Sequence, residues 1–229
     1  MCFSVEADVV AGVALLPVAG LALREVRCTR ELPFALLPLV FAVHQLLEAF
    51  VWAGLSGDVS RHVQHTATIA YLLIAFPLLP LLLPLSVLLL EPQGARQRVA
   101  PFVALGGAVA VYLGEAVLAH PVTVIQHPHA LEYSVQLSYG DFWAVLYIGA
   151  VIGPSVLSGY PSIVLFGWLN LFGLTAAAVL YQEAFASLWC IWAAAMSVLV
   201  VVHLTLRRRL PDPHRLHGQP LVLGLSAAP

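Results

Sequence analysis

Seven apolar stretches divide this sequence, and their lengths limit the folds that it can adopt. They cover residues 9–23, 33–55, 67–90, 99–119, 142–157, 162–181 and 184–206. A helix needs about 17–25 mainly apolar residues to cross a bilayer. The chain is 61% hydrophobic and 10% charged, whereas soluble domains are about 45–50% apolar and about 25% charged. We therefore predict an all-α integral membrane protein, a bundle of seven transmembrane helices in the lipid bilayer.

The distribution of arginine predicts how this bundle is oriented. Arginine concentrates in the first and third connections and after the last apolar stretch: Arg24, Arg27, Arg30, Arg96, Arg98, Arg207, Arg208, Arg209 and Arg215. Cytoplasmic segments of membrane proteins carry an excess of basic residues. We therefore expect an N-out, C-in protein of the inner (cytoplasmic) membrane. The first stretch follows acids rather than basic residues, so we expect an anchor and not a cleaved signal peptide.

The domain organisation follows from the same pattern. Residues 1–209 form one seven-helix transmembrane domain, and residues 210–229, rich in proline and glycine, form a disordered cytoplasmic tail. The third stretch contains Pro77, Pro80 and Pro84, each of which is expected to bend its helix. Packing geometry is preferred over a gating kink as the reason for these prolines.

Several functional classes are excluded by missing residues. The chain has no lysine, so it cannot form the retinal Schiff base of a rhodopsin-type pump. It has three cysteines without a CxxC pair, which gives no support to a zinc finger or a thioredoxin-like motif. No basic patch with interleaved aromatic residues indicates a nucleic-acid partner.

The few polar residues of the apolar stretches identify a candidate site. His44, Glu48 and Trp52 follow one another at intervals of four residues and so share one helix face. An ionised side chain at the centre of a membrane helix costs at least about 2.5–3.5 kcal/mol, so Glu48 and Glu115 should face the bundle or a watery cavity. With the predicted orientation, most of the unusual polar residues fall on the outer half of the protein. They include Cys2, His44, Glu48, Glu115, His120 and Cys190, and the histidines His62, His65, His127 and His129 of the outer connections.

Three kinds of chemistry fit this set of residues. A metal site would use Cys2, His44, Glu48 and His120 as ligands for copper, zinc or iron. A membrane-embedded enzyme acting on a lipophilic small molecule would use Glu48 or Glu115 as a general acid and Cys2 or Cys190 as a nucleophile. The alternative is a non-enzymatic proton-coupled carrier, a sensor or an accessory membrane subunit. Cys2 and Cys190 could instead form a disulfide, since both are predicted on the oxidising side.

Five short motifs give the chain a resemblance to known sequences. They are Met1-Cys2-Phe3-Ser4, Arg30-Glu31-Leu32-Pro33, the stretch from His44 to Glu48 followed by Trp52, Glu91-Pro92, and the stretch from Phe185 to Cys190. With these motifs the chain resembles an uncharacterised family of bacterial multi-pass membrane proteins. The resemblance implies a membrane fold and a bacterial origin, but no reaction. Relatives often carry glutamine at position 44, which favours Cys2, Glu48, Trp189 and Cys190 over His44 as site residues.

Overall fold

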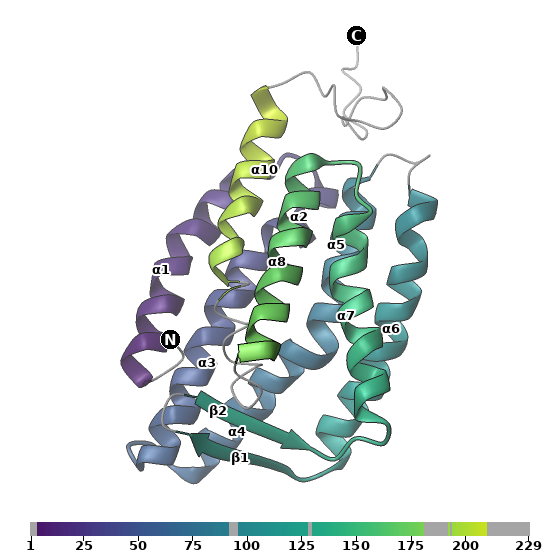
Figure 1. Ribbon diagram of the computed structural model, residues 1–229. Helices are drawn as coiled ribbons and strands as arrows, with labels where there is room; N and C mark the ends of the chain where they lie inside the picture. Colours follow the sequence, from purple (N-terminus) through teal and green to yellow (C-terminus); the bar gives the residue numbers. More distant parts are fainter. Residues whose placement is uncertain (1–3, 92–95, 128–129, 181–191, 193, 210–229) are drawn as a thin grey trace.

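The helices lie side by side in a bundle, and a two-stranded sheet lies across one end of it (Figure 1). The structure is a computed structural model that describes residues 4–91, 96–127, 130–180, 192 and 194–209. The longer helices are α1 (Val5–Arg24), α3 (Leu37–Ser56), α4 (Arg61–Leu73), α5 (Leu79–Leu90), α6 (Arg96–Ala119), α7 (Gly140–Val156), α8 (Pro161–Leu180) and α10 (Val198–Arg209). The short elements η1 (Thr29–Glu31) and α2 (Leu32–Ala35) precede α3, and the π-helical turn η2 (Ile74–Leu78) joins α4 to α5.

Five helical segments are long and apolar enough to cross a membrane. They are Val5–Arg24, Thr29–Ser56, Arg61–Leu90, Arg96–Ala119 and Pro161–Val179. Two further apolar helices, Gly140–Val156 and Ala194–Leu206, are shorter. The structure thus supports a multi-pass membrane protein. Part of the seventh predicted stretch, residues 184–191 and 193, lies outside the described residues, as does the predicted tail 210–229.

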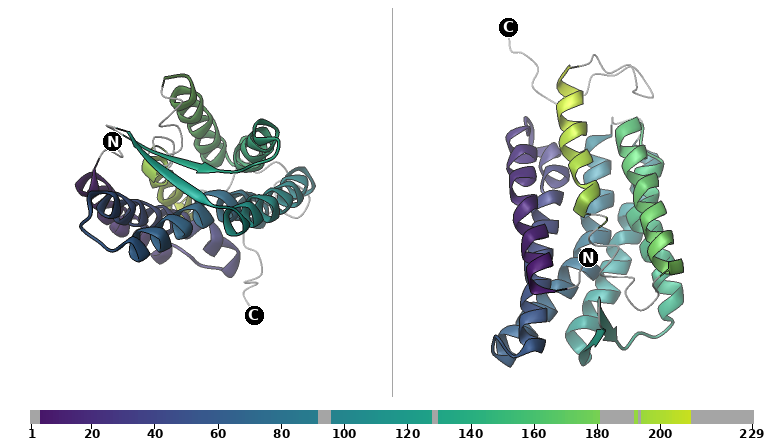
Figure 2. Two further views of the ribbon diagram at one scale, coloured as in Figure 1. Left: turned by 90° about the horizontal axis from the view of Figure 1, so that it is seen from below. Right: turned by 60° about the vertical axis from the view of Figure 1, so that its left-hand side comes forward.

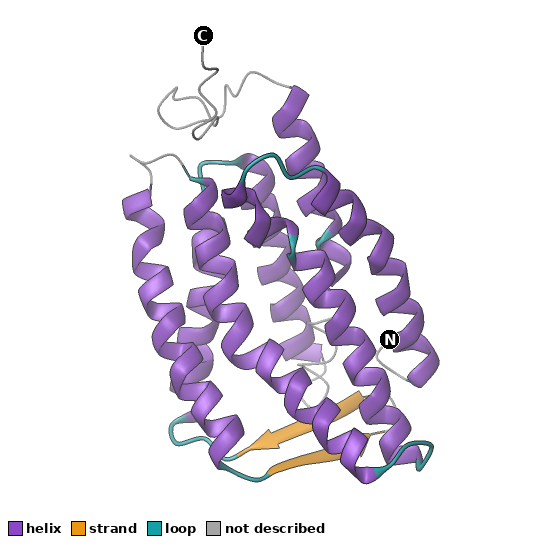
Figure 3. Ribbon diagram, turned by 180° about the vertical axis from the view of Figure 1, so that it is seen from behind, coloured by secondary structure: helices purple, strands orange, loops and turns teal. Residues whose placement is uncertain are grey.

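The sheet corrects the all-α prediction. Residues 120–141, which the sequence predicts as a plain connection, contain the antiparallel strands β1 (Val122–His127) and β2 (Ala130–Val135). In their register Val122 pairs with Val135 and His127 pairs with Ala130. The first four residues of β1 are valine, threonine, valine and isoleucine. All four are β-branched, which favours a strand. Figures 2 and 3 show this hairpin crossing the ends of the helices.

Local capping explains why α3 and α4 turn back on each other at the hairpin end of the bundle. Gly57 ends α3 with a left-handed φ of 88°, a conformation that glycine adopts without steric cost. Ser60 then begins α4, because its hydroxyl accepts the backbone N–H of Val63 at 3.3 Å. At the same end, Ser4 caps the start of α1 by accepting the N–H of Ala7 at 3.3 Å.

The prolines of the third stretch produce a π-helical turn in an otherwise continuous helix. The N–H of Leu79 bonds to the carbonyl of Ile74, five residues back, and position 80 is a proline without an N–H. The carbonyl of Ala75 therefore lacks a backbone donor, and the hydroxyl of Tyr147 in α7 donates to it at 2.6 Å. A neighbouring helix thus satisfies the group that the proline leaves unpaired, as membrane helices require.

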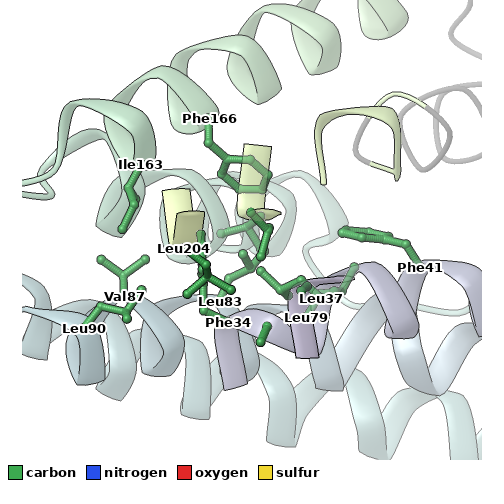
Figure 4. Packing of buried hydrophobic residues seen from close by; sticks show 14 of the residues in the cluster. Phe34, Leu37, Phe41, Leu79, Leu83, Val87, Leu90, Ile163, Phe166 and Leu204 are labelled. Carbon is green, nitrogen blue, oxygen red and sulfur yellow. The ribbon is translucent and has the colours of Figure 1, made fainter. Parts of the chain in front are cut away.

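The core lies between the helices, toward the end of the bundle opposite the sheet. Its largest cluster combines residues of α2, α3, α5, α8 and α10, most of them less than 5% exposed. Figure 4 shows Phe34 and Leu37 facing Leu79, Leu83 and Leu204. Close to this core, the buried carboxylate of Glu91 accepts the Ser158 hydroxyl at 2.6 Å and the Gly159 N–H at 2.7 Å. These bonds fasten the end of α5 to the turn between α7 and α8.

Candidate functional site: a buried polar layer under the hairpin

Three consecutive inward positions of α3 carry polar side chains. His44, Gln45 and Glu48 are all 0% exposed. Both ring nitrogens of His44 and both amide atoms of Gln45 have no hydrogen-bond partner among the described residues. Buried polar groups are paired in the great majority of cases, so unmet capacity of this kind is a functional signal. One turn further, Trp52 is 4% exposed, and its ring extends the same face toward the hairpin end.

A second helix brings another carboxyl group to the same level. Asp8 of α1 is 0% exposed. Helices α1 and α3 are antiparallel neighbours, and a Cβ at Gly12 would meet the side chain of Leu46 and the carbonyl of Ala42. Because the two helices run in opposite directions, a residue one turn before Gly12 in α1 lies beside residues one turn after Ala42–Leu46 in α3. Asp8 is therefore level with Glu48. We call Asp8, His44, Gln45 and Glu48 the polar layer.

Asp8 is not among the site residues predicted from the sequence, because it precedes the first apolar stretch together with Glu6 and resembles a polar flank. The signal was present, since the buried positions of α1 are Asp8, Gly12, Leu15, Ala19 and Ala22. Their spacing of four, three, four and three residues is that of one helix face. An acid that shares its helix face with buried small and apolar residues is expected to point into the bundle.

An aromatic stack connects the polar layer to the hairpin. The imidazole of His44 lies 3.9 Å from the ring of Tyr71 in α4, and Tyr71 lies 4.5 Å from the ring of Tyr133 in β2, between ring centroids. The planes are 21° and 19° apart, so both pairs are stacked. Tyr133 could not be anticipated without strand β2, and no sequence pattern singles out Tyr71 within the third apolar stretch.

The hairpin packs closely against the helices beneath it. Ala130 and Leu131 of β2 are 3% and 1% exposed, and Leu131 packs in a cluster with Val51 and Trp52 of α3. On the other side of the sheet, the imidazole of His127 lies 2.8 Å from the carboxylate of Glu132 on the opposite strand. The hairpin therefore covers the polar layer at this end of the bundle.

The remaining predicted site residues do not join this layer. Glu115 lies on the exposed face of α6, and His120 is exposed just after that helix, where its Nδ1 donates to the Ala116 carbonyl at 3.3 Å. The expectation that Glu115 faces the bundle or a cavity does not hold. The neighbouring residues of α6 that are buried in the bundle are Leu113, Gly114, Ala116 and Val117. His62 and His65 are also exposed.

The predicted ligands do not form a metal site within the described residues. There, no three histidine, cysteine or acidic side chains converge in a way that could hold an ion. Of the four predicted ligands, His44 and Glu48 lie in the polar layer, whereas His120 lies on the surface. Cys2 and Cys190, together with Trp189 and His129, lie outside the described residues.

Fold and site together define a class of protein. An apolar bundle with five helices able to cross a membrane, and with carboxyl and imidazole groups sealed inside it, is a multi-pass membrane protein with an internal polar site. The chain belongs to a family of unknown function, DUF6629, whose model matches residues 1–216. This confirms the resemblance to an uncharacterised family. No curated protein and no solved structure matches the chain.

Proposed function

We propose that the chain crosses the bacterial inner membrane seven times, with its N-terminus outside. Five long helices and two shorter apolar helices supply the crossings. The 17 residues of α7 extend about 26 Å at about 1.5 Å per residue, near the lower limit for a span. Helices α1 and α10 end, and α6 begins, with arginine at the end of the bundle opposite the hairpin. The excess of basic residues in cytoplasmic segments assigns that end to the cytoplasm.

In this orientation the polar layer lies in the outer half of the membrane. Its function is to bind and release protons, as part of a proton-coupled carrier or a sensor. The observation that carries this proposal is the burial of two carboxyl groups and one imidazole at one level of two adjacent helices. Carboxyl and imidazole groups inside membranes are costly to retain, and they commonly form proton relays. Two carboxyl groups and an imidazole in one solvent-free layer titrate as a coupled unit.

A metal-dependent enzyme is the alternative with less support. It needs Cys2 or Cys190 beside Glu48, and the two other residues that were expected to line its site, Glu115 and His120, lie on the surface. Elemental analysis of the purified protein separates the two functions. Stoichiometric copper, zinc or iron that disappears in Glu48→Ala would favour the enzyme.

Infrared difference spectroscopy between two pH values tests proton binding directly. Protein in lipid should show a carbonyl band of a protonated carboxylic acid that changes with pH. Glu48→Gln and Asp8→Asn should each remove part of that band. Glu115→Gln is the matched control, because its carboxyl group is exposed and outside the layer. If the spectra of Glu48→Gln and Asp8→Asn match that of the wild type, the layer does not titrate and the proposal fails.

A further inference from the structure

The end of the bundle opposite the hairpin holds two arginines that each have an unused hydrogen-bond donor. Arg30 belongs to η1, and Arg96 is the first residue of α6. Atom Nη1 of Arg30 and atom Nη2 of Arg96 are both buried and have no hydrogen-bond partner among the described residues. A guanidinium group is always charged and carries only donors, so a buried nitrogen without an acceptor is unfavourable. Each side chain therefore has one buried nitrogen that lacks an acceptor.

The two guanidinium groups lie near each other although they are far apart in the sequence. Element η1 packs against α5, and the Nε of Arg96 donates to the backbone carbonyl of Glu91, directly after α5, at 3.1 Å. Both arginines thus flank the same helix end, and the charge of Arg30 acts unfavourably on Arg96. Two like charges that are close enough to interact repel each other unless a negative charge lies between them.

Two nearby acids, Glu91 and Glu31, already accept hydrogen bonds from other groups. Glu91 accepts the Ser158 hydroxyl and the Gly159 N–H, and its other oxygen lies 3.8 Å from Arg98. Glu31 accepts the N–H of Arg27 at 2.8 Å. Among the side chains that the structure describes, the connections at this end contribute five arginines, Arg24, Arg27, Arg30, Arg96 and Arg98, against three acids, Glu25, Glu31 and Glu91. Positive charge therefore remains in excess at this end.

We propose that Arg30 and Arg96 together bind a phosphate-type oxyanion. The planar donor fork of arginine matches the oxygens of a phosphate, and the anion would remove the repulsion between the two groups. The phosphate comes either from the head group of an anionic phospholipid in the adjoining leaflet or from free phosphate in the cytoplasm. Basic pockets between helices on the cytoplasmic side bind phospholipid head groups in other membrane proteins. This site is independent of the polar layer at the opposite end.

Thermal unfolding of the purified full-length protein tests the site in two arms. In the first arm, inorganic phosphate is titrated into protein in a neutral detergent at constant ionic strength. In the second arm, the protein is placed in nanodiscs of phosphatidylcholine with increasing amounts of phosphatidylglycerol. A saturable rise in Tm in the phosphatidylglycerol arm alone identifies a lipid head group, and a saturable rise with inorganic phosphate identifies the free anion.

Substitutions locate the effect. Arg30→Gln and Arg96→Gln should each weaken the apparent affinity by about tenfold or more, as loss of a charged hydrogen bond predicts. Arg27→Gln is the matched control, because Arg27 is exposed at the same end and should keep the response. Without phosphate or anionic lipid, Arg30→Gln should be at least as stable as the wild type, since it removes a repulsion. Absence of saturation in both arms, or an equal loss in Arg27→Gln, would overturn the proposal.

Discussion

The imidazole of His44 in α3 is stacked on the ring of Tyr71 in α4, with ring centroids 3.9 Å apart and both side chains buried. This contact holds two antiparallel helices together at the level of the polar layer. Tyr71→Ala should reduce the free energy of unfolding by about 3–5 kcal/mol, because it removes a large buried ring. Another aromatic ring packs on each face of that ring. Tyr71→Phe keeps the stack and should lose far less. Denaturant or thermal unfolding in a mild detergent measures the difference, and equal losses would argue against stacking as the stabilising contact.

Tyr133 should control access to the polar layer, because it is the strand residue stacked on Tyr71. Tyr133→Ala is expected to accelerate hydrogen–deuterium exchange in the turns of α3 and α4 nearest the hairpin while α5 remains protected. Ser134→Ala is the control, since Ser134 neighbours Tyr133 on the exposed side of the same strand. Unchanged exchange in Tyr133→Ala would mean that the hairpin does not shield the layer.

Gly106 of α6 should tolerate no side chain, because a Cβ there would collide with the backbone carbonyl of Pro80 in α5. Backbone cannot move aside as a flexible side chain can, so Gly106→Ala should separate the two helices and lower Tm strongly. Gly107→Ala offers a matched control in the next position, where no atom lies within 4 Å of the added Cβ. We expect this control to unfold at or above the wild-type temperature, since alanine favours a helix over glycine.

The hydrogen bond from Tyr147 to Ala75 should be needed to stabilise the π-helical turn. Tyr147→Phe leaves the Ala75 carbonyl without its 2.6 Å donor and should cost about 1–3 kcal/mol of unfolding free energy. Tyr139→Phe removes the hydroxyl of a tyrosine that is 83% exposed and should change stability little. Equal stability of the two variants would show that another donor satisfies this carbonyl.

Glu91 should be the acid whose loss most weakens the end of the bundle opposite the hairpin. Its carboxylate accepts two hydrogen bonds of 2.6 and 2.7 Å from the turn between α7 and α8. Hydrogen bonds to a charged group contribute about 1.5–3 kcal/mol each, so Glu91→Ala should be strongly destabilising. Glu115→Ala, at an exposed position of α6, should be nearly neutral in the same unfolding assay. The opposite order would contradict the assignment of these two acids.

Glu48 and Glu115 show where sequence reasoning about the site succeeds and where it stops. Both are acids in apolar stretches, and the cost of a membrane carboxylate predicted inward positions for both. Glu48 shares its helix face with His44 and is sealed in the bundle, whereas Glu115 lies on the outward face of α6. The inward face of α6 contains Gly106, which lets the backbone of α5 approach closely. That choice depends on the partner helix and cannot be read from one helix alone.

The amino-acid sequence by itself determined the membrane class, the approximate helices and the burial of Glu48, because hydropathy and helical spacing are local properties. The tertiary structure alone decided which residues share the polar layer with Glu48. Antiparallel packing of α1 on α3 brought Asp8 to its level, and a hairpin formed after α6 brought Tyr133 onto Tyr71, which is stacked on His44. These contacts join residues that are far apart in the chain. Only the packing of whole helices and strands against one another sets which of their residues meet.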